Sequence, residues 1–343
     1  MMRLVRAILL ALIVSSTASL AQDSKIEISL PTDNDALFQG GGPDFYQYIE
    51  RDFHGEKSTP WEGGRYGFVR NPVPTVQGLI YTRFHEGIDI RCLHRDARGE
   101  PLDDVRAIAD GKIVHTNHTP GYSNYGRYIV IEHDWDGSPY YSLYGHLSEI
   151  AVNVGQRVNR GERIAHMGYS GEGLNQARAH VHLELNLMFN RNFESWHDRF
   201  FRDPNHNGIY NGINLAGLDI ARFFIEHEKR PDLTVPQFLA EEETFYKVAV
   251  PESSHFDLRK SYPWMVKSGS ANAKSWEVSF ARSGVPLQIE ARSEPVAQPT
   301  LTYVKKTTIN CDYLTRGELA GIGEHAHLTE NGIRSMQLLT WPD

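Results

Sequence analysis

The chain contains few cysteines. Its 343 residues include only two, Cys92 and Cys311. At most one disulfide can therefore form, and nothing in the sequence places the two thiols within bridging distance. Free cysteine is among the most often buried residue types, so we predict two unpaired, largely buried thiols.

The sequence also lacks a long hydrophobic run. The apolar stretch from Ala7 to Val14 is shorter than the about 20 helical residues that cross a bilayer. It follows Arg3 and Arg6, and small and polar residues follow it up to Ala21. This order is typical of a secretory signal peptide, with cleavage after Ala21. We therefore expect export to the periplasm or the extracellular space, with no transmembrane segment in the mature chain.

Positive charge is scarce as well. Lys and Arg number 35 against 43 Asp and Glu, which gives a formal net charge of −8. Loss of residues 1–21 would remove two arginines and no acid, so the mature chain would be more negative still. Nucleic-acid binding depends on basic side chains that neutralise phosphates. Nucleic acid is therefore not expected as a partner.

From about residue 62 the sequence consists of short apolar runs with alternating polarity, separated by turn pairs such as Asp110-Gly111 and Asp136-Gly137. Alternation with a period of two indicates strands, and Asp-Gly pairs favour hairpin turns. The pattern predicts a mainly β fold with an antiparallel core. The expected strands of this core are 112–114, 127–132, 140–144 and 180–187.

Later segments differ in texture. An apolar stripe predicts a helix over Asn214–Glu228, and the aromatic stretch Phe45–Phe53 suggests one short helix. Strand-like runs return at 276–280, 285–291 and 301–305. We predict a signal peptide (1–21), an N-terminal extension (22–61), a core domain (62–190), a connector with a helix (191–240) and a mostly β accessory module (241–343).

Two short motifs carry the chemistry. The segment FHEGIDI contains His85 and Asp89, and AHVHLEL contains His180 and His182. Residues two apart on a strand point to the same side, so His180 and His182 face one site. Two imidazoles and one carboxylate form a usual ligand set for catalytic zinc. One of the paired histidines would bind the metal, and the other would stand beside its open position.

Other metal arrangements fit less well. His85-Glu86 begins the helical HExxH signature, but Asp89 stands where the second histidine is required. An iron facial triad uses the same ligand types, so ligand composition alone leaves iron open. A second HxH pair, His325 and His327, has no acidic partner at a recognisable spacing, and we interpret it as solvated.

Together, HEGID, YGHL at residues 144–147 and HVHLEL resemble the lysostaphin-type zinc metallopeptidases, the M23 or LytM family, over residues 62–190. This resemblance implies a compact antiparallel β core and one zinc ion bound by His85, Asp89 and His182. It also implies that His146 and His180 are the catalytic histidines beside an activated water. Glu184, on the strand face of His182, would orient an imidazole or would be a surface carboxylate.

The resemblance implies cleavage of the stem or bridge peptides of peptidoglycan. Two alternatives stay open: a secreted zinc protease that acts on proteins, and a non-catalytic wall-binding regulator of other hydrolases. The family often has a Thr-Gly pair before its HxH motif, where this chain has 176–179 (QARA), so its substrate preference is open. Latent forms occur in the family, but no motif in residues 22–61 shows that they cover the groove, so an inhibitory role is open. The sequence leaves the oligomeric state and the role of 241–343 undetermined.

Overall fold

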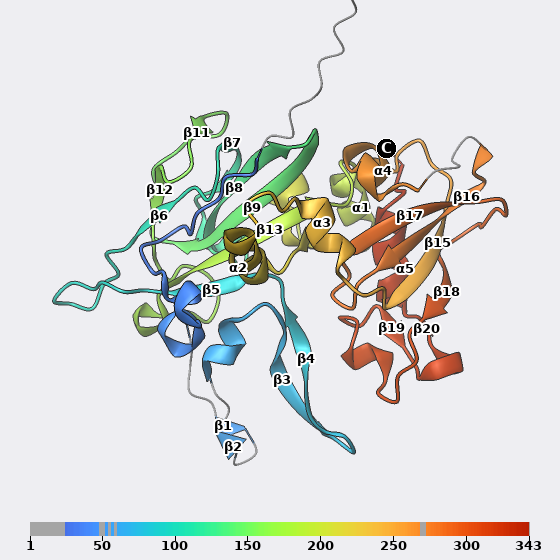
Figure 1. Cartoon of the computed structure of the whole chain (residues 1–343), viewed down its shortest axis with the longest axis horizontal. Helices are drawn as coiled ribbons and strands as arrows, with labels where there is room; N and C mark the ends of the chain where they lie inside the picture. The colour runs from blue at the N-terminus through green and yellow to red at the C-terminus, as the bar shows by residue number, and fades with distance from the viewer. Residues whose placement is uncertain (1–24, 48–51, 54–55, 58–59, 268–271, 343) are drawn as a thin grey trace, which may run out of the picture.

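A computed structural model describes residues 25–47, 52–53, 56–57, 60–267 and 272–342. Its centre is a seven-stranded antiparallel sheet in the order β11-β7-β8-β9-β13-β14, with β5 also paired to β13 (Figure 1). These strands are β5 (Ile88–Arg91), β7 (Gly111–Asn117), β8 (Arg127–Trp135), β9 (Ser138–Leu147), β11 (Arg157–Val158), β13 (His180–Met188) and β14 (Leu215–Gly217). The predicted mainly β fold and the four predicted core strands are confirmed.

Strand β13 is buried along its whole length, so both of its faces are packed. Alternate residues from Val181 to Leu187 enter the main hydrophobic core. The other face carries His182, Glu184 and Asn186, which are polar and also buried. Polar side chains on a fully buried strand need partners, and this face is where the candidate site lies.

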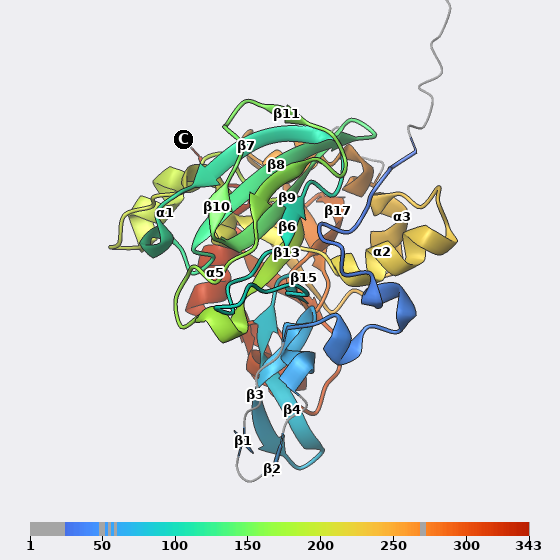
Figure 2. The same cartoon turned by 90° about the vertical axis from the view of Figure 1, so that its left-hand side faces the viewer.

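Smaller sheets flank the main one. A three-stranded sheet has the order β10-β12-β6, with β6 (Asp104–Arg106), β10 (Glu149–Ile150) and β12 (Arg163–His166). A hairpin of β3 (Gly67–Thr75) and β4 (Gly78–His85) projects away from the main sheet in both views (Figures 1 and 2). Two further short pairs are β1 (Asp52–Phe53) with β2 (Glu56–Lys57) and β19 (Leu319–Ala320) with β20 (His327–Leu328).

The connector contains three α-helices, α1 (Phe193–Phe200), α2 (Ile220–Lys229) and α3 (Val235–Ala240). The prediction of a helix from Asn214 was wrong in its first part, because Leu215–Gly217 pairs with β13 as strand β14. Asp219 then caps α2 by accepting a hydrogen bond from the backbone N–H of Arg222. Pairing with a neighbouring strand thus outweighed the apolar stripe that suggested an earlier start.

The C-terminal region forms a four-stranded sheet in the order β17-β16-β15-β18, on the right in Figure 1. It comprises β15 (Tyr246–Pro251), β16 (Ser275–Phe280), β17 (Pro286–Arg292), β18 (Thr300–Val304), α4 (Asp257–Ser261) and α5 (Glu330–Leu338). The three strands predicted here are confirmed. One hydrophobic core runs without a break from Ile26 through the main sheet to Leu339.

The N-terminal extension packs against this core through Ile26, Leu37 and Phe45. The short helix expected from Phe45 is not formed by the described residues of that stretch, because Tyr46 bridges to Ile90 of β5 and Asp52–Phe53 form β1. The proposed signal peptide lies outside the described residues.

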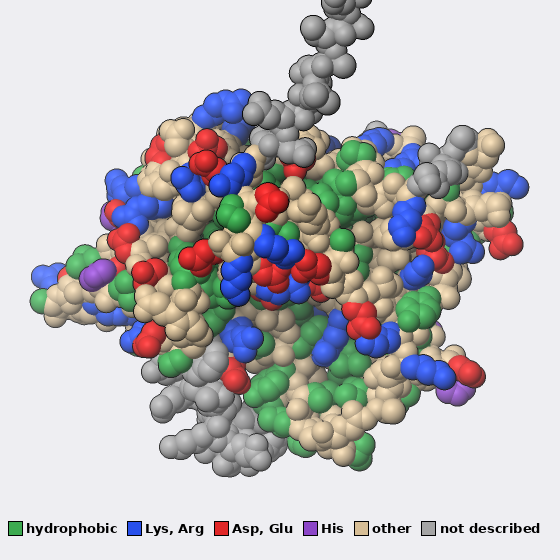
Figure 3. Space-filling model, in the orientation of Figure 1, with side chains coloured by type: hydrophobic (Ala, Val, Ile, Leu, Met, Phe, Trp, Pro, Cys, Tyr) green, Lys and Arg blue, Asp and Glu red, His purple; other side chains and the backbone are tan. Residues whose placement is uncertain are grey.

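Two properties of the described chain bear on the sequence predictions. Cys92 and Cys311 are both buried and unpaired, as predicted. No helix within the described ranges has the length and apolar character needed to cross a membrane. Acidic and basic side chains are interspersed on the face shown in Figure 3.

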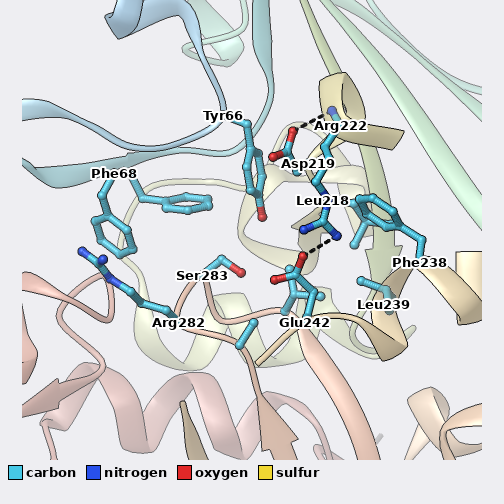
Figure 4. A pocket seen from close by; sticks show the side chains of 13 residues that line it. Tyr66, Phe68, Leu218, Asp219, Arg222, Phe238, Leu239, Glu242, Arg282 and Ser283 are labelled. Carbon is cyan, nitrogen blue, oxygen red and sulfur yellow. Dashed lines mark hydrogen bonds and ion pairs between the residues drawn. The ribbon is translucent and has the colours of Figure 1, made fainter. Parts of the chain in front are cut away.

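A small cavity of about 210 Å³ lies where the hairpin, the connector and the C-terminal region meet (Figure 4). Its wall includes an ion pair of 2.6 Å between Arg222 Nη2 and Glu242 Oε1. Tyr66 points into the cavity and its hydroxyl donates to the carbonyl of Gly217 at 2.8 Å. These pairings connect α2 to the segment before β15 and the residue before β3 to strand β14.

Candidate metal centre and active site

The two sequence motifs meet because their strands are neighbours. His182 on β13 is directly opposite Asp89 on β5, and His85 ends β4 one turn earlier. Gly87 lies in that turn, and a Cβ atom there would be 2.3 Å from the carbonyl oxygen of Leu183. Only glycine therefore lets the turn close against β13, which brings His85 to the same place as His182.

Three ligand atoms converge in this place. His85 Nε2 lies 3.0 Å from His182 Nδ1 and 3.1 Å from Asp89 Oδ1, and His182 Nδ1 lies 2.9 Å from that same oxygen. All three residues are buried, and they are the set of His, Cys, Asp and Glu side chains in the described chain that could hold a metal ion.

Hydrogen bonds determine which nitrogen of each ring is free. His85 Nδ1 lies 2.8 Å from the carbonyl oxygen of Arg65, and His182 Nε2 lies 2.7 Å from Glu184 Oε1. Each of these oxygens accepts a hydrogen bond, so the ring proton is on the nitrogen that faces the oxygen, which is Nδ1 of His85 and Nε2 of His182. In the neutral tautomers this network assigns, His85 Nε2 and His182 Nδ1 therefore present lone pairs to each other and to Asp89.

This donor set fits a zinc ion. Two lone pairs and a carboxylate oxygen about 3 Å apart repel one another unless a cation lies among them. Tetrahedral zinc ligands at about 2.0 to 2.2 Å are separated by roughly 3.4 Å, close to the spacing found here. The outward nitrogens of both rings are hydrogen-bonded, which is usual for metal-binding histidines.

Arg70, from strand β3, holds the other oxygen of Asp89. Its Nη2 lies 2.7 Å from Asp89 Oδ2, and its Nε donates to the carbonyl of Gly63 at 2.8 Å. Burial raises the pKa of Asp89, but His85, His180 and Arg70 outweigh it and hold that pKa well below its usual range. Asp89 is therefore a charged carboxylate at neutral pH.

Glu184 is almost fully buried, with 1% of its surface exposed, so it is not a surface carboxylate. Its Oε1 also accepts from the Tyr125 hydroxyl at 2.8 Å, and its Oε2 accepts from Asn186 Nδ2 at 2.9 Å. Burial lowers the pKa of His182, but the hydrogen bonds to Asp89 and Glu184 raise it to about 9 overall. Without a metal ion this ring therefore carries a proton on both nitrogens at neutral pH, and a zinc ion bound at Nδ1 would replace the proton there and leave the neutral tautomer described above.

The remaining two histidines stand beside the triad. The rings of His146 and His180 are 4.7 Å apart, and His180 Nε2 lies 3.4 Å from Asp89 Oδ1. Each has its Nδ1 bound to a backbone carbonyl oxygen, His146 to Ser170 at 2.8 Å and His180 to Arg178 at 2.7 Å. Both Nε2 atoms are thus left as acceptors.

The backbone at His146 is strained. Its φ of 63° lies in the left-handed region that favours glycine, and its N–H donates to the carbonyl of Tyr125 at 2.7 Å. Such strain often occurs where the surrounding structure fixes a functional side chain. Burial, His180 and His182 lower the pKa of His146 well below its ordinary value, so its ring is neutral.

All five residues line one groove of about 960 Å³. Its walls come from the hairpin, the segments around Tyr122–Tyr125 and Asn207–Ile213, and the loop at 172–174; Gln47 and Arg316 add to it from the two ends of the chain. Of the 176–179 stretch, Arg178 lines the groove. The second HxH pair lies elsewhere, and both His325 and His327 are exposed, as interpreted from the sequence.

Sequence reasoning missed Arg70, Tyr125, Asn186 and Ser170. Asn186 could have been found, since it continues the polar face of His182 and Glu184 with a period of two. The roles of Arg70 and Tyr125 depend on contacts between distant segments, and Ser170 acts through its backbone carbonyl. No local pattern marks those three.

Comparison with known proteins finds similarity over the segment that contains the site residues. The model of the family described as peptidase family M23 matches residues 83–193. The chain is 43% identical over 81 residues to the peptidoglycan DD-endopeptidase ShyA of Vibrio cholerae, covering 24% of this chain and 17% of that protein. It is 37% identical over 82 residues to the murein hydrolase activator EnvC of Escherichia coli, again covering 24% and 17%.

The match to lipoprotein NlpD of Yersinia enterocolitica is 35% identical over 75 residues and covers 22% of this chain and 69% of the relative. The chain thus spans less than a fifth of the length of ShyA and EnvC, but over two thirds of this NlpD. The chain belongs to peptidase family M23.

Proposed function

We propose that the protein is an exported zinc metalloendopeptidase that hydrolyses peptide bonds of peptidoglycan. His85, Asp89 and His182 bind one zinc ion, and His146 and His180 are the catalytic histidines. The observation that carries the proposal is the convergence of four buried side chains and the half-buried His146, whose inward-facing atoms are all acceptors when the rings are neutral. The signal-like segment 1–21 supports export.

The mechanism follows from the acceptor atoms. Zinc would supply Lewis-acid polarisation of the scissile carbonyl and a water made nucleophilic near neutral pH. The neutral ring of His146 can take the proton of that water at Nε2 and pass it to the leaving amine. Whichever of the two rings, His146 or His180, receives the proton can donate a hydrogen bond from Nε2 to the developing oxyanion until that proton passes to the amine.

The carbonyls of Ser170 and Arg178 support these proton transfers. Each accepts from Nδ1 of its histidine, which fixes the ring orientation and keeps Nε2 directed toward the groove. A protonated ring is stabilised by the same carbonyl, because both of its nitrogens are then donors. Proton transfer thus needs no rotation of either imidazole.

The proposal predicts distinct losses for the two kinds of residue. We expect His85→Ala to lose stoichiometric zinc and all wall hydrolysis. His146→Ala should retain zinc and lose most hydrolysis, since a general base contributes about 10²- to 10⁴-fold. The exposed His325→Ala is the matched control and should behave as the wild-type protein. Zinc by atomic absorption and release of soluble peptides from purified peptidoglycan are the measurements.

Mass spectrometry of the digest would identify the cleaved bond. Release of fragments from proteins but not from peptidoglycan would instead support a secreted protease.

A non-catalytic regulator is the second candidate, and the similarity to the activator EnvC favours it. The complete set of ligands and both flanking histidines oppose it, since a regulator needs none of them. Peptidoglycan binding without hydrolysis by the zinc-loaded wild-type protein would establish the regulator instead.

A further inference from the structure

We propose that Arg83 is a specificity-determining residue that binds a carboxylate of the substrate next to the metal centre, so that the groove selects anionic peptides. This inference rests on the proposed function, because it assigns a substrate class to the same groove.

Arg83 is placed for this role by strand β4. Arg83 and His85 are two residues apart on this strand, so their side chains project from the same face at roughly 6.6 Å spacing. Both residues line the groove. A guanidinium there reaches a substrate residue adjacent to the peptide bond that lies at the metal site.

The hairpin register sets Arg83 directly opposite Arg70. Like charges in directly opposed positions destabilise a strand pair. Arg70 is compensated, because it binds Asp89 and the carbonyl of Gly63. Within the described ranges, the exposed side chain of Arg83 makes no hydrogen bond or ion pair. An incoming carboxylate would supply the missing partner.

The charge of the residues that line the groove also favours an anionic substrate. Its lining contains four arginines, no lysine and four acids, in a chain that is acidic overall. Two of the acids are already paired, Asp89 with Arg70 and Glu86 with Arg316 at 2.7 Å. A divalent cation would therefore make the occupied groove net positive. Arginine binds carboxylates with two parallel hydrogen bonds, which lysine cannot do.

The test compares two substrates in the full-length zinc-loaded protein. One is a synthetic crosslinked stem peptide with free carboxylates, and the other is the same peptide with carboxamides. For Arg83→Gln we expect KM for the free-carboxylate peptide to rise about tenfold or more, as for loss of a hydrogen-bonded charge partner. KM for the carboxamide peptide and kcat for both peptides should stay unchanged.

Two further variants sharpen this result. Arg83→Lys should recover only part of the lost affinity, because the charge remains and the two-pronged geometry is lost. Arg98→Gln removes one exposed arginine outside the groove lining and should change neither KM. An equal rise in KM for both peptides, or no rise, would overturn the role of Arg83.

Failure of the proposed function is distinguishable from failure of this inference. If the wild-type protein cuts neither peptide, hydrolysis is disproved, and binding of the fluorescently labelled pair is measured by anisotropy. Tighter binding of the free-carboxylate peptide that disappears in Arg83→Gln supports the inference even then. Equal binding of the two peptides by the wild-type protein rejects it.

Discussion

Arg70 Nη2 lies 2.7 Å from Asp89 Oδ2, while the other oxygen of that carboxylate faces His85 and His182 at about 3 Å. One oxygen of Asp89 thus faces the candidate metal site, and the other binds the guanidinium of Arg70. Arg70 comes from the β3–β4 hairpin, which also supplies His85. The hairpin therefore positions two of the three ligands.

Replacing Arg70 should weaken zinc binding without removing a ligand. In Arg70→Gln the carboxylate of Asp89 loses its charged partner and its fixed rotamer. Loss of such an outer contact typically costs about 10- to 100-fold in metal affinity. Zinc dissociation constants from competition with a fluorescent chelator measure the effect. Arg83→Gln, one strand away on the same hairpin, is the control and should bind zinc as the wild-type protein does.

Glu184 is expected to act on zinc affinity through the ring of His182. Glu184→Ala removes the acceptor of His182 Nε2 and leaves the Tyr125 hydroxyl and Asn186 amide without this buried partner. We expect zinc affinity to fall by about tenfold or more. Glu184→Gln keeps an oxygen acceptor and should lose less. Equal zinc affinity in all three proteins would show that Glu184 only fills space.

The sequence predicted those elements of the fold that depend on residues close together in the chain, and it misplaced those that depend on distant residues. Strands such as β8 and β13 were predicted correctly because alternation is a local pattern. The helix start at Asn214 was misplaced because Leu215–Gly217 pairs with β13, and the paired residues are 27 to 31 positions apart in the chain. Local apolar spacing cannot distinguish the two outcomes.

The site residues also differ in whether a local pattern or a long-range contact identifies them. The HxH pair and the HEGID segment were recognisable because each lies within a few residues. Their convergence follows from pairing of β5 with β13, which the spacing of Asp89 and His182 does not specify. Arg70 was missed because its contact depends on the hairpin register, which includes a bulge between Phe68 and Arg70.

The C-terminal region should be required for folding of the core. Met188, the last residue of β13, donates its backbone N–H to the Tyr262 hydroxyl at 3.0 Å, and Asn190 donates to the carbonyl of Leu338 at 2.8 Å. Removal of 241–343 would leave these groups unpaired and would expose the continuous core. We expect the chain ending at residue 240 to be insoluble or unfolded by circular dichroism. A soluble, zinc-binding fragment would show that the region is a separable module.

A point variant tests the same junction more gently. Tyr262→Phe removes the acceptor of the Met188 N–H in a fully buried position. An unsatisfied buried donor costs about 1 to 3 kcal/mol of unfolding free energy. Urea denaturation of the full chain measures this change. Tyr303→Phe, on the exposed side of β18, is the control and should change stability by less than about 0.5 kcal/mol.

Stability should fall as the pH drops below 6.5, because buried histidines are held neutral. His133 is fully buried, with its ring nitrogens 2.7 Å from the Asp110 carbonyl oxygen and from Ser142 Oγ. Burial lowers the pKa of His133 to about 4, and it does the same for His115. The unfolded chain takes up protons from about pH 6.5, whereas the folded chain does not until near pH 4, so protonation favours unfolding within that window. Each such histidine contributes a slope of at most about 1.4 kcal/mol per pH unit.

Urea denaturation of zinc-loaded protein between pH 7 and 5 should show this loss of stability. His133→Gln should lower the stability at pH 7, and it should also reduce the dependence of stability on pH by the contribution of one histidine. An unchanged slope in His133→Gln would mean that His133 takes up its proton over the same pH range in the folded and unfolded chains, and would contradict the lowered pKa.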